Sequence, residues 1–190
     1  GTRIAVVTMK DKADSLSKDG VAIYKLPSME VMDFTPSLAG KKKFTLPTFN
    51  EDATMAWFMA TSDTLASGSK NEAIYLFKET LPTKKVKASW NVAEILPQGY
   101  TDGLPKGYAV TDQSSARFNY SNTRLIVNVS PIKAPKDTTI VESEQASLDV
   151  WSYDALRLPP QQKVSRGSRT LSAVIDLANT GKIVLITKTP

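Results

Sequence analysis

The sequence predicts an all-β protein: an open part of a β-propeller, with about three blades that are antiparallel four-stranded sheets. Three observations predict it. A polar turn leading into a strand recurs along the chain, those strands carry apolar side chains on both faces, and the chain has no convincing amphipathic helix of about 12 or more residues. Strands that are apolar on both faces need a covering layer on each side, and propeller blades stack face against face.

The recurring turn appears most clearly in two places. "FNEDATMAWF" begins at Phe49 and "FNYSNTRLIV" begins at Phe118, so that Phe, Asn and Thr recur 69 positions apart. A weaker third copy, "IDLANTGKIVLI", begins at Ile175 and shares the Asn-Thr pair. Each copy is expected to be a turn that precedes a strand, and recurrence of this kind indicates a repeated supersecondary unit.

The strands after these turns are expected to be central in their sheets. Alternate side chains of a strand point to opposite faces, and along residues 55–60 both sets are apolar. The segments 125–129 and 183–186 follow the same pattern, apart from Asn128. We therefore expect covering layers on both sides of all three strands.

The third and fourth strands of each blade are predicted from a second recurrent pattern. An aromatic strand, a Leu-Pro turn and a short outer strand occur in "AIYLFKETLPTKKV" at 73–86 and in "LDVWSYDALRLPPQQKV" at 148–164, with an earlier form, "AIYKLPSMEV", at 22–31. Proline cannot donate to a β-ladder, so it marks the junction where one strand has ended and the next has not begun. The pattern predicts outer strands ending at Val86 and Val164.

These patterns divide the chain of 190 residues into five parts. The best helix candidate, 88–100, is short and ends near Pro97, and we interpret it as part of a connection between blades. Gly1 is interpreted as a tag scar. Closed propellers have about 4 to 8 blades, so a longer parent protein is expected. The predicted parts are a blade tail (2–35), a blade (44–87), an inserted connection (88–107), a second blade (108–165) and the start of another (169–190).

Composition excludes several kinds of chemistry. The chain has no cysteine and no histidine, which removes disulfides, thiol nucleophiles, Ser-His-Asp triads and the commonest transition-metal ligands. The net charge is +5, but the basic residues are spread over turns, so no nucleic-acid partner is expected. No apolar run is long enough to cross a bilayer. We assign no catalytic, metal or cofactor-binding residue, and the substrate-binding residues are left unknown.

Tryptophans and acidic residues are the remaining candidates for a site. Trp57 and Trp151 fall on strand periodicity and are predicted to pack within blades, whereas Trp90 is open between packing and ligand binding. Four acidic residues have neither the spacing of a calcium loop nor a setting that would tune a catalytic carboxylate pair, and are predicted to be solvated. They are Asp137, Glu142, Glu144 and Asp149.

The segment "FNYSNTRLIVNVSPIKAPKDTTIVESEQASLDVWSYDALRLPPQQKV" resembles the N-terminal propeller of prolyl-oligopeptidase-like serine peptidases, particularly those of Bacteroidetes. The resemblance covers about residues 107–164. In that family a C-terminal α/β-hydrolase domain holds the serine nucleophile, the acid and the histidine, while the propeller limits which peptides reach them. The resemblance therefore implies a partner hydrolase domain, a peptide substrate and a periplasmic or extracellular location.

None of the family's catalytic residues maps onto this chain. "SGSK" and "RGSR" both break the G-x-S-x-G pattern, and Glu142 and Glu144 match no substrate-binding motif. The hypothesis is thus a non-catalytic propeller segment that gates or scaffolds peptide access to a hydrolase domain absent from this chain. The alternative is a propeller-type binding module for a peptide, glycan or protein partner, without catalysis. Whether the parent protein is an enzyme stays open.

Overall fold

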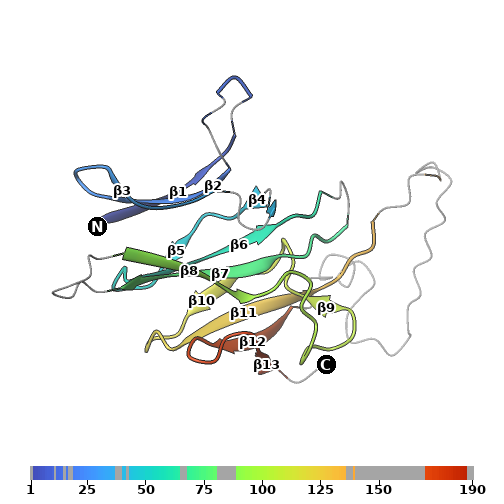
Figure 1. Ribbon diagram of the computed structural model, residues 1–190. Coiled ribbons are helices and arrows are strands. Elements are labelled where there is room, and N and C mark those ends of the chain that lie inside the picture. Colours follow the sequence, from blue (N-terminus) through green and yellow to red (C-terminus); the bar gives the residue numbers. More distant parts are fainter. Residues whose placement is uncertain are drawn as a thin grey trace, which may run out of the picture.

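The computed structural model describes residues 2–10, 12–14, 16, 19–36, 40–41, 43–64, 68–80, 89–135, 139 and 170–187. These residues form thirteen strands and no α-helix, and every strand pair is antiparallel. The predicted all-β class with antiparallel sheets is therefore confirmed. Figure 1 shows the strands arranged as three sheets in successive layers.

The three sheets follow one another along the chain. The first sheet has the order β1 (Arg3–Thr8), β2 (Gly20–Lys25), β3 (Glu30–Pro36). In the middle sheet, β4 (Lys43–Phe44) and β5 (Thr48–Phe49) both pair with β6 (Met55–Thr61), followed by β7 (Ala73–Thr80) and β8 (Ser89–Leu96). In the third sheet, β9 (Tyr108–Ala109) and β10 (Ala116–Phe118) both pair with β11 (Arg124–Pro131), followed by β12 (Leu171–Asp176) and β13 (Ile183–Leu185).

The repeated turn of the sequence is a repeated turn of the structure. Between β5 and β6, the Asn50 Oδ1 atom accepts hydrogen bonds from the backbone N–H groups of Thr54 and Met55, both at 2.9 Å. Ala53 has a φ of 54°, in the left-handed region that a non-glycine residue adopts only in such tight turns. The Asn side chain thus closes the turn and starts the central strand.

The second copy has the same geometry between β10 and β11. The Asn119 Oδ1 atom accepts from the N–H groups of Thr123 at 2.9 Å and Arg124 at 2.8 Å, and Asn122 takes the left-handed φ of 56°. Because the 69-residue offset holds from turn to strand, the middle and third sheets share a plan of a split first strand and a long second strand.

The middle sheet is buried on both faces, as predicted for residues 55–60. All seven residues of β6 are buried. Phe58 faces the first sheet, with its ring centroid 5.3 Å from that of Tyr75 and 5.2 Å from that of Phe77. Burial of each such side chain contributes roughly 1.5–3 kcal/mol. The opposite face joins a larger cluster with the third sheet, which includes Met55, Trp57, Met59, Ile74, Leu76, Leu125, Val127, Val129, Ala173 and Ile175.

The outer sheets differ from the prediction because, within the described residues, only their inner faces are covered. Ile126, Val174 and Val184 lie in register across β11, β12 and β13, and point away from the middle sheet. Val184 is 65% exposed. On the first sheet, Ile4 and Val6 are likewise exposed on the side away from the core. Among the described residues, no fourth sheet covers either outer face.

The described strands can be placed against the predicted parts of the chain. The first sheet spans Arg3 to Pro36, in the part predicted as a blade tail (2–35). β8, however, lies inside the predicted connection 88–107, and β12 and β13 complete the third sheet instead of starting another blade. The weak third copy of the turn accordingly links β12 to β13. The predicted outer strands ending at Val86 and Val164 lie outside the described residues.

The physical reason is strand pairing, which the pattern within a single segment does not specify. β8 pairs with β7 over seven positions, and this ladder overrides the weak helical pattern of its sequence. β12 pairs with β11 over six positions although a long connection separates them. Neither partner is specified by local sequence.

Candidate functional site

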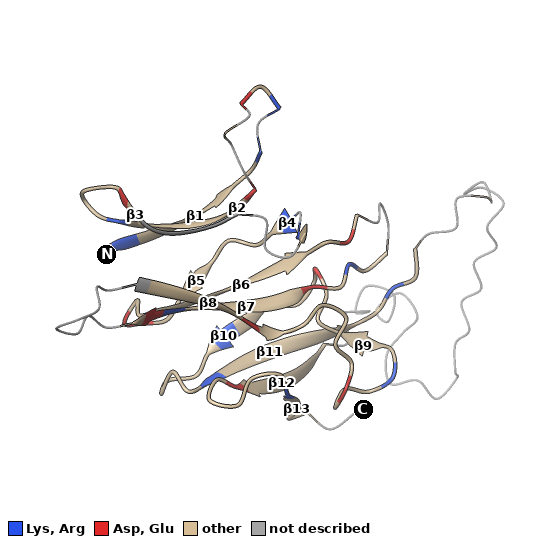
Figure 2. Cartoon of the chain, viewed as in Figure 1, with Lys and Arg blue, Asp and Glu red and all other residues tan. Residues whose placement is uncertain are grey.

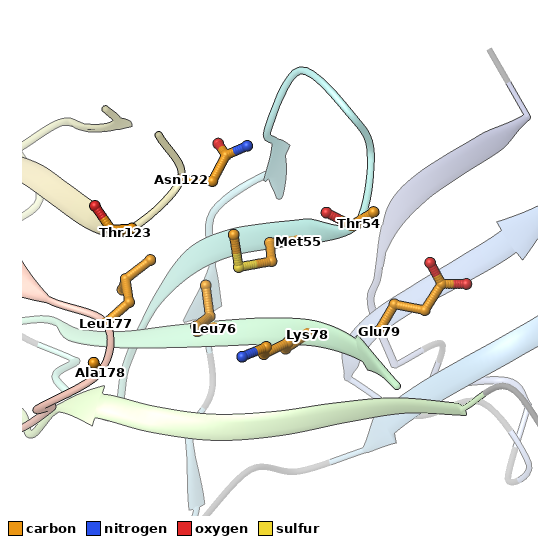
Figure 3. A pocket seen from close by; sticks show the side chains of 9 residues that line it. All are labelled: Thr54, Met55, Leu76, Lys78, Glu79, Asn122, Thr123, Leu177 and Ala178. Carbon is orange, nitrogen blue, oxygen red and sulfur yellow. The ribbon is translucent and has the colours of Figure 1, made fainter. Parts of the chain in front are cut away.

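A groove between the middle and third sheets is the candidate site. It consists of two adjoining hollows of about 400 Å³ and about 510 Å³ at the end of β7. Both hollows are lined by Leu76, Lys78, Glu79 and Leu177. Figure 3 shows how side chains from the first repeated turn, the second repeated turn and the turn after β12 surround the first hollow. The remaining lining residues are Thr54, Met55, Thr80, Asn91, Ala93, Ile95, Asn122, Thr123, Ala178 and Thr180.

The groove lies at the end of β7 opposite to the backbone hydrogen bonds that join the two sheets where β7 begins. Where β7 begins, the Glu72 N–H donates to the Val110 carbonyl at 3.0 Å, and the Ser69 N–H donates to the Lys133 carbonyl at 2.9 Å. These bonds hold the two sheets together directly. Beside the second hollow, the turn after β12 is joined to β8 by a backbone hydrogen bond from the Gly181 N–H to the Ile95 carbonyl, at 2.9 Å. Around this bond the sheets meet through side chains and turns, which leaves the space of the groove.

Among the described residues that line the groove, Lys78 is the basic one. Alternation along β7 places it on the face of Ile74 and Leu76, toward the third sheet, but it is exposed where they are buried. In Figure 3 its ammonium group is directed toward Leu76 and Ala178. Within the part of the chain that the structure describes, Lys78 forms no ion pair or hydrogen bond.

Glu79, the next residue, is neutralised by the first sheet. Its carboxylate lies 2.7 Å from the Arg3 guanidinium, and both side chains are largely buried. Arg3 also donates to the Ala53 carbonyl and lies over the Trp90 ring at 5.4 Å from its centroid. Since the charge of Glu79 is compensated, the groove walls carry a net positive charge from Lys78.

The two repeated turns lie side by side at the rim of the groove. The Asn122 amide donates to the Asp52 carboxylate at 3.2 Å, from one turn to the other. A smaller hollow of about 240 Å³ lies between the two turns, where Tyr120 is 96% exposed. The repeat therefore forms part of the candidate site as well as of the scaffold.

The groove walls combine apolar side chains with a few polar groups. Its Thr54 and Thr123 hydroxyls are engaged by the turn side chains of Asn50 and Asn119, at 3.1 Å and 3.2 Å. Within the described ranges, no group of three or more acidic, cysteine or histidine residues is placed to hold a metal ion. The groove offers an apolar floor, a cation and hydrogen-bonding groups at its rim.

A second polar feature lies at the opposite end of β7. Glu72 is only 7% exposed, and its Oε2 atom has no hydrogen-bond partner among the described residues. Burial raises the pKa of Glu72 to about 7, and the Asp112 carboxylate acts in the same direction, while Lys70 opposes the rise. A carboxyl group of this kind weakens the fold once it ionises. Sequence reasoning did not single it out.

The tryptophans that the structure describes belong to the core. Trp57 is buried against the third sheet, which confirms its predicted packing role. Trp90 is buried as well, with edge-on contacts to Phe49 at 6.1 Å and Phe77 at 6.3 Å, so packing is its role in this fold. Trp151 lies outside the described residues, as do the acidic residues Asp137, Glu142, Glu144 and Asp149.

Charge is distributed over the whole molecule. In Figure 2 the Lys and Arg residues that are coloured occur at strand ends and connections of all three sheets, without gathering on one element. Over the described part of the chain, no helix has the length and apolar character to span a membrane.

No protein-family model, curated protein or solved structure matches this chain. The role of the groove is therefore argued from its own chemistry.

Proposed function

We propose that this chain is a non-catalytic β-propeller segment that scaffolds or gates peptide access to the hydrolase domain of a prolyl-oligopeptidase-like serine peptidase. The observation that carries the scaffold role is the middle sheet, buried on both faces between two sheets whose outer faces expose apolar side chains. The peptidase assignment and the periplasmic or extracellular location rest on the sequence resemblance over about residues 107–164.

The direction of stacking supports further sheets of the same kind. Trp57 on β6 faces the third sheet, and its equivalent 69 positions later, Ile126, faces away from the middle sheet. The two sheets thus present equivalent faces in the same direction. Repeating that step places a fourth sheet on the exposed row of Ile126, Val174 and Val184, as in a propeller whose blades follow one another around an axis.

The test is the parent protein. We expect its reading frame to continue beyond Pro190 into a strand, a G-x-S-x-G turn and a helix, with a histidine further on. The expressed parent is expected to cleave peptides, and substitution of that serine is expected to abolish cleavage. A parent without a hydrolase domain contradicts the peptidase assignment, and a parent structure in which no sheet covers Val184 contradicts the scaffold role.

The groove supports a second candidate function. A propeller-type binding module needs a recessed surface with an apolar floor and a few polar groups, and the groove between the middle and third sheets has both. In that case the parent is expected to consist of further repeats without a hydrolase domain. The same gene sequence separates the two functions.

A further inference from the structure

We propose that the groove at the end of β7 binds a ligand with an apolar body and a single carboxylate, such as the C-terminal residue of a peptide. Two properties of the groove lead to this ligand class. Its floor is apolar and large enough for a side chain, and the described residues of its walls carry one uncompensated positive charge.

The floor selects for apolar groups. Met55, Leu76 and Leu177 form the base of the first hollow, and Ala93 and Ile95 extend the apolar surface along β8 in the second. The volumes of about 400 Å³ and about 510 Å³ fall in the range of small-molecule sites. An aliphatic side chain placed there removes apolar surface from water on both partners, which gives roughly 25 cal/mol per Å² buried.

The walls select for a negative group. Lys78 has no acidic partner among the described residues, whereas the neighbouring Glu79 is paired with Arg3 at 2.7 Å. The Thr180 hydroxyl lines the same hollow as Lys78, and within the described residues it forms no hydrogen bond. An ammonium group and a hydroxyl group are suitable donors for the two oxygens of one carboxylate.

Other ligand classes fit less well. A cationic ligand would be repelled by Lys78, and no unpaired carboxylate among the described lining residues would offset that repulsion. A phosphate group carries more charge and is usually held by several cations or backbone N–H groups, and the described residues of the groove walls supply a single cation. A glycan favours exposed aromatic platforms, and none of the described residues that line the two hollows is aromatic.

This inference goes beyond the proposed scaffold role and does not depend on it. The binding test uses only the 190-residue chain, whereas the peptidase assignment is tested on the parent gene. A negative binding result does not contradict the peptidase assignment, and a parent gene without a hydrolase domain does not contradict ligand binding in the groove.

The experiment compares two probes that differ only in charge, N-acetyl-leucine and N-acetyl-leucinamide. Each is titrated into the isotope-labelled chain, and backbone amide shifts are followed by nuclear magnetic resonance. We expect saturable shifts at residues 78–80 and 177–180 at millimolar concentrations, with the carboxylate binding about two- to fivefold more tightly than the amide, in line with the strength of exposed charge pairs.

Two variants locate the charge effect. Lys78→Met keeps much of the side-chain volume and is expected to reduce carboxylate binding to the level of the amide, without changing the amide's affinity. Lys106→Met removes the same charge from an exposed position that does not line the groove, and is expected to leave both affinities unchanged. Unfolding curves that match the wild-type chain confirm that both variants fold.

Three results overturn the proposal. The first is that the groove residues show no saturable shifts with either probe. The second is that the amide binds as tightly as the carboxylate, and the third is that Lys78→Met weakens the binding of both probes equally. A further variant, Leu177→Asn, tests the apolar floor and is expected to weaken both probes by about the same factor. Unchanged affinity in that variant contradicts the assigned location.

Discussion

The paired turns allow a stability prediction with a built-in comparison. Asn50 and Asn119 make equivalent hydrogen bonds in equivalent turns, but Asn50 is 6% exposed and Asn119 is only half-buried. Replacing either residue with Ala removes two hydrogen bonds from backbone N–H groups and one to a threonine hydroxyl. The two substitutions therefore differ mainly in whether water can replace the lost partner.

The expected magnitudes follow from that difference. A net hydrogen bond contributes about 1 kcal/mol, and a buried donor left without a partner costs about 1–3 kcal/mol. At Asn50 the Met55 N–H is buried and would be left unpaired, so Asn50→Ala is expected to cost about 3 kcal/mol. At Asn119 the freed N–H groups reach solvent, so Asn119→Ala is expected to cost about 1 kcal/mol.

Urea unfolding monitored by circular dichroism measures both free energies. Asn50→Asp serves as a control, because its carboxylate retains the acceptor for both N–H groups and is expected to recover most of the stability lost in Asn50→Ala. The reasoning is wrong if Asn119→Ala costs as much as Asn50→Ala, or if Asn50→Asp is as unstable as Asn50→Ala.

Three further predictions concern other parts of the fold. Glu72→Gln is expected to leave the free energy of unfolding unchanged below about pH 4.5 and to raise it above pH 7 by at most about 3 kcal/mol. The reason is that the pKa of Glu72 is higher in the folded than in the unfolded state, so the wild-type protein becomes less stable as the pH rises from the unfolded to the folded pKa. Urea unfolding at about pH 4 and about pH 8 measures this, and an equal gain at both contradicts it. Phe58→Ala is expected to cost about 3–5 kcal/mol, because it removes a fully buried ring from its contacts with Tyr75 and Phe77; thermal unfolding checks this, and a cost below about 1 kcal/mol argues against close packing there. Val184→Lys is expected to change stability by less than about 0.5 kcal/mol while reducing self-association in light scattering, and unchanged scattering counts against an adhesive outer face.

The parts of the fold that the sequence predicts are those set by local chemistry. The Asn and Thr of each turn are visible as a repeat because their side chains close the turn within five residues. The two-faced apolar pattern of 55–60 predicts a strand covered on both sides, since alternation alone decides which side chains need burial.

The parts that could not be predicted depend on distant partners. The sequence of β8 has a weak helical pattern, and its pairing with β7 makes it a strand. Nothing near residues 171–176 indicates that β12 pairs with β11. The groove is harder to predict, because three separate turns and three strands supply its walls. One signal was present in the sequence: Lys78 continues the row of Ile74 and Leu76, and a charge in an apolar row marks where the covering layer ends.

The common direction of the middle and third sheets has a consequence for the isolated chain. Its two terminal surfaces are different from each other, so two copies that meet through them associate head to tail, in a heterologous contact that leaves one surface of each kind free. Such growth stops only if the rotation per copy closes a circle, and it otherwise continues as a filament. Flanking sheets in a parent protein would prevent this polymerisation by occupying both ends.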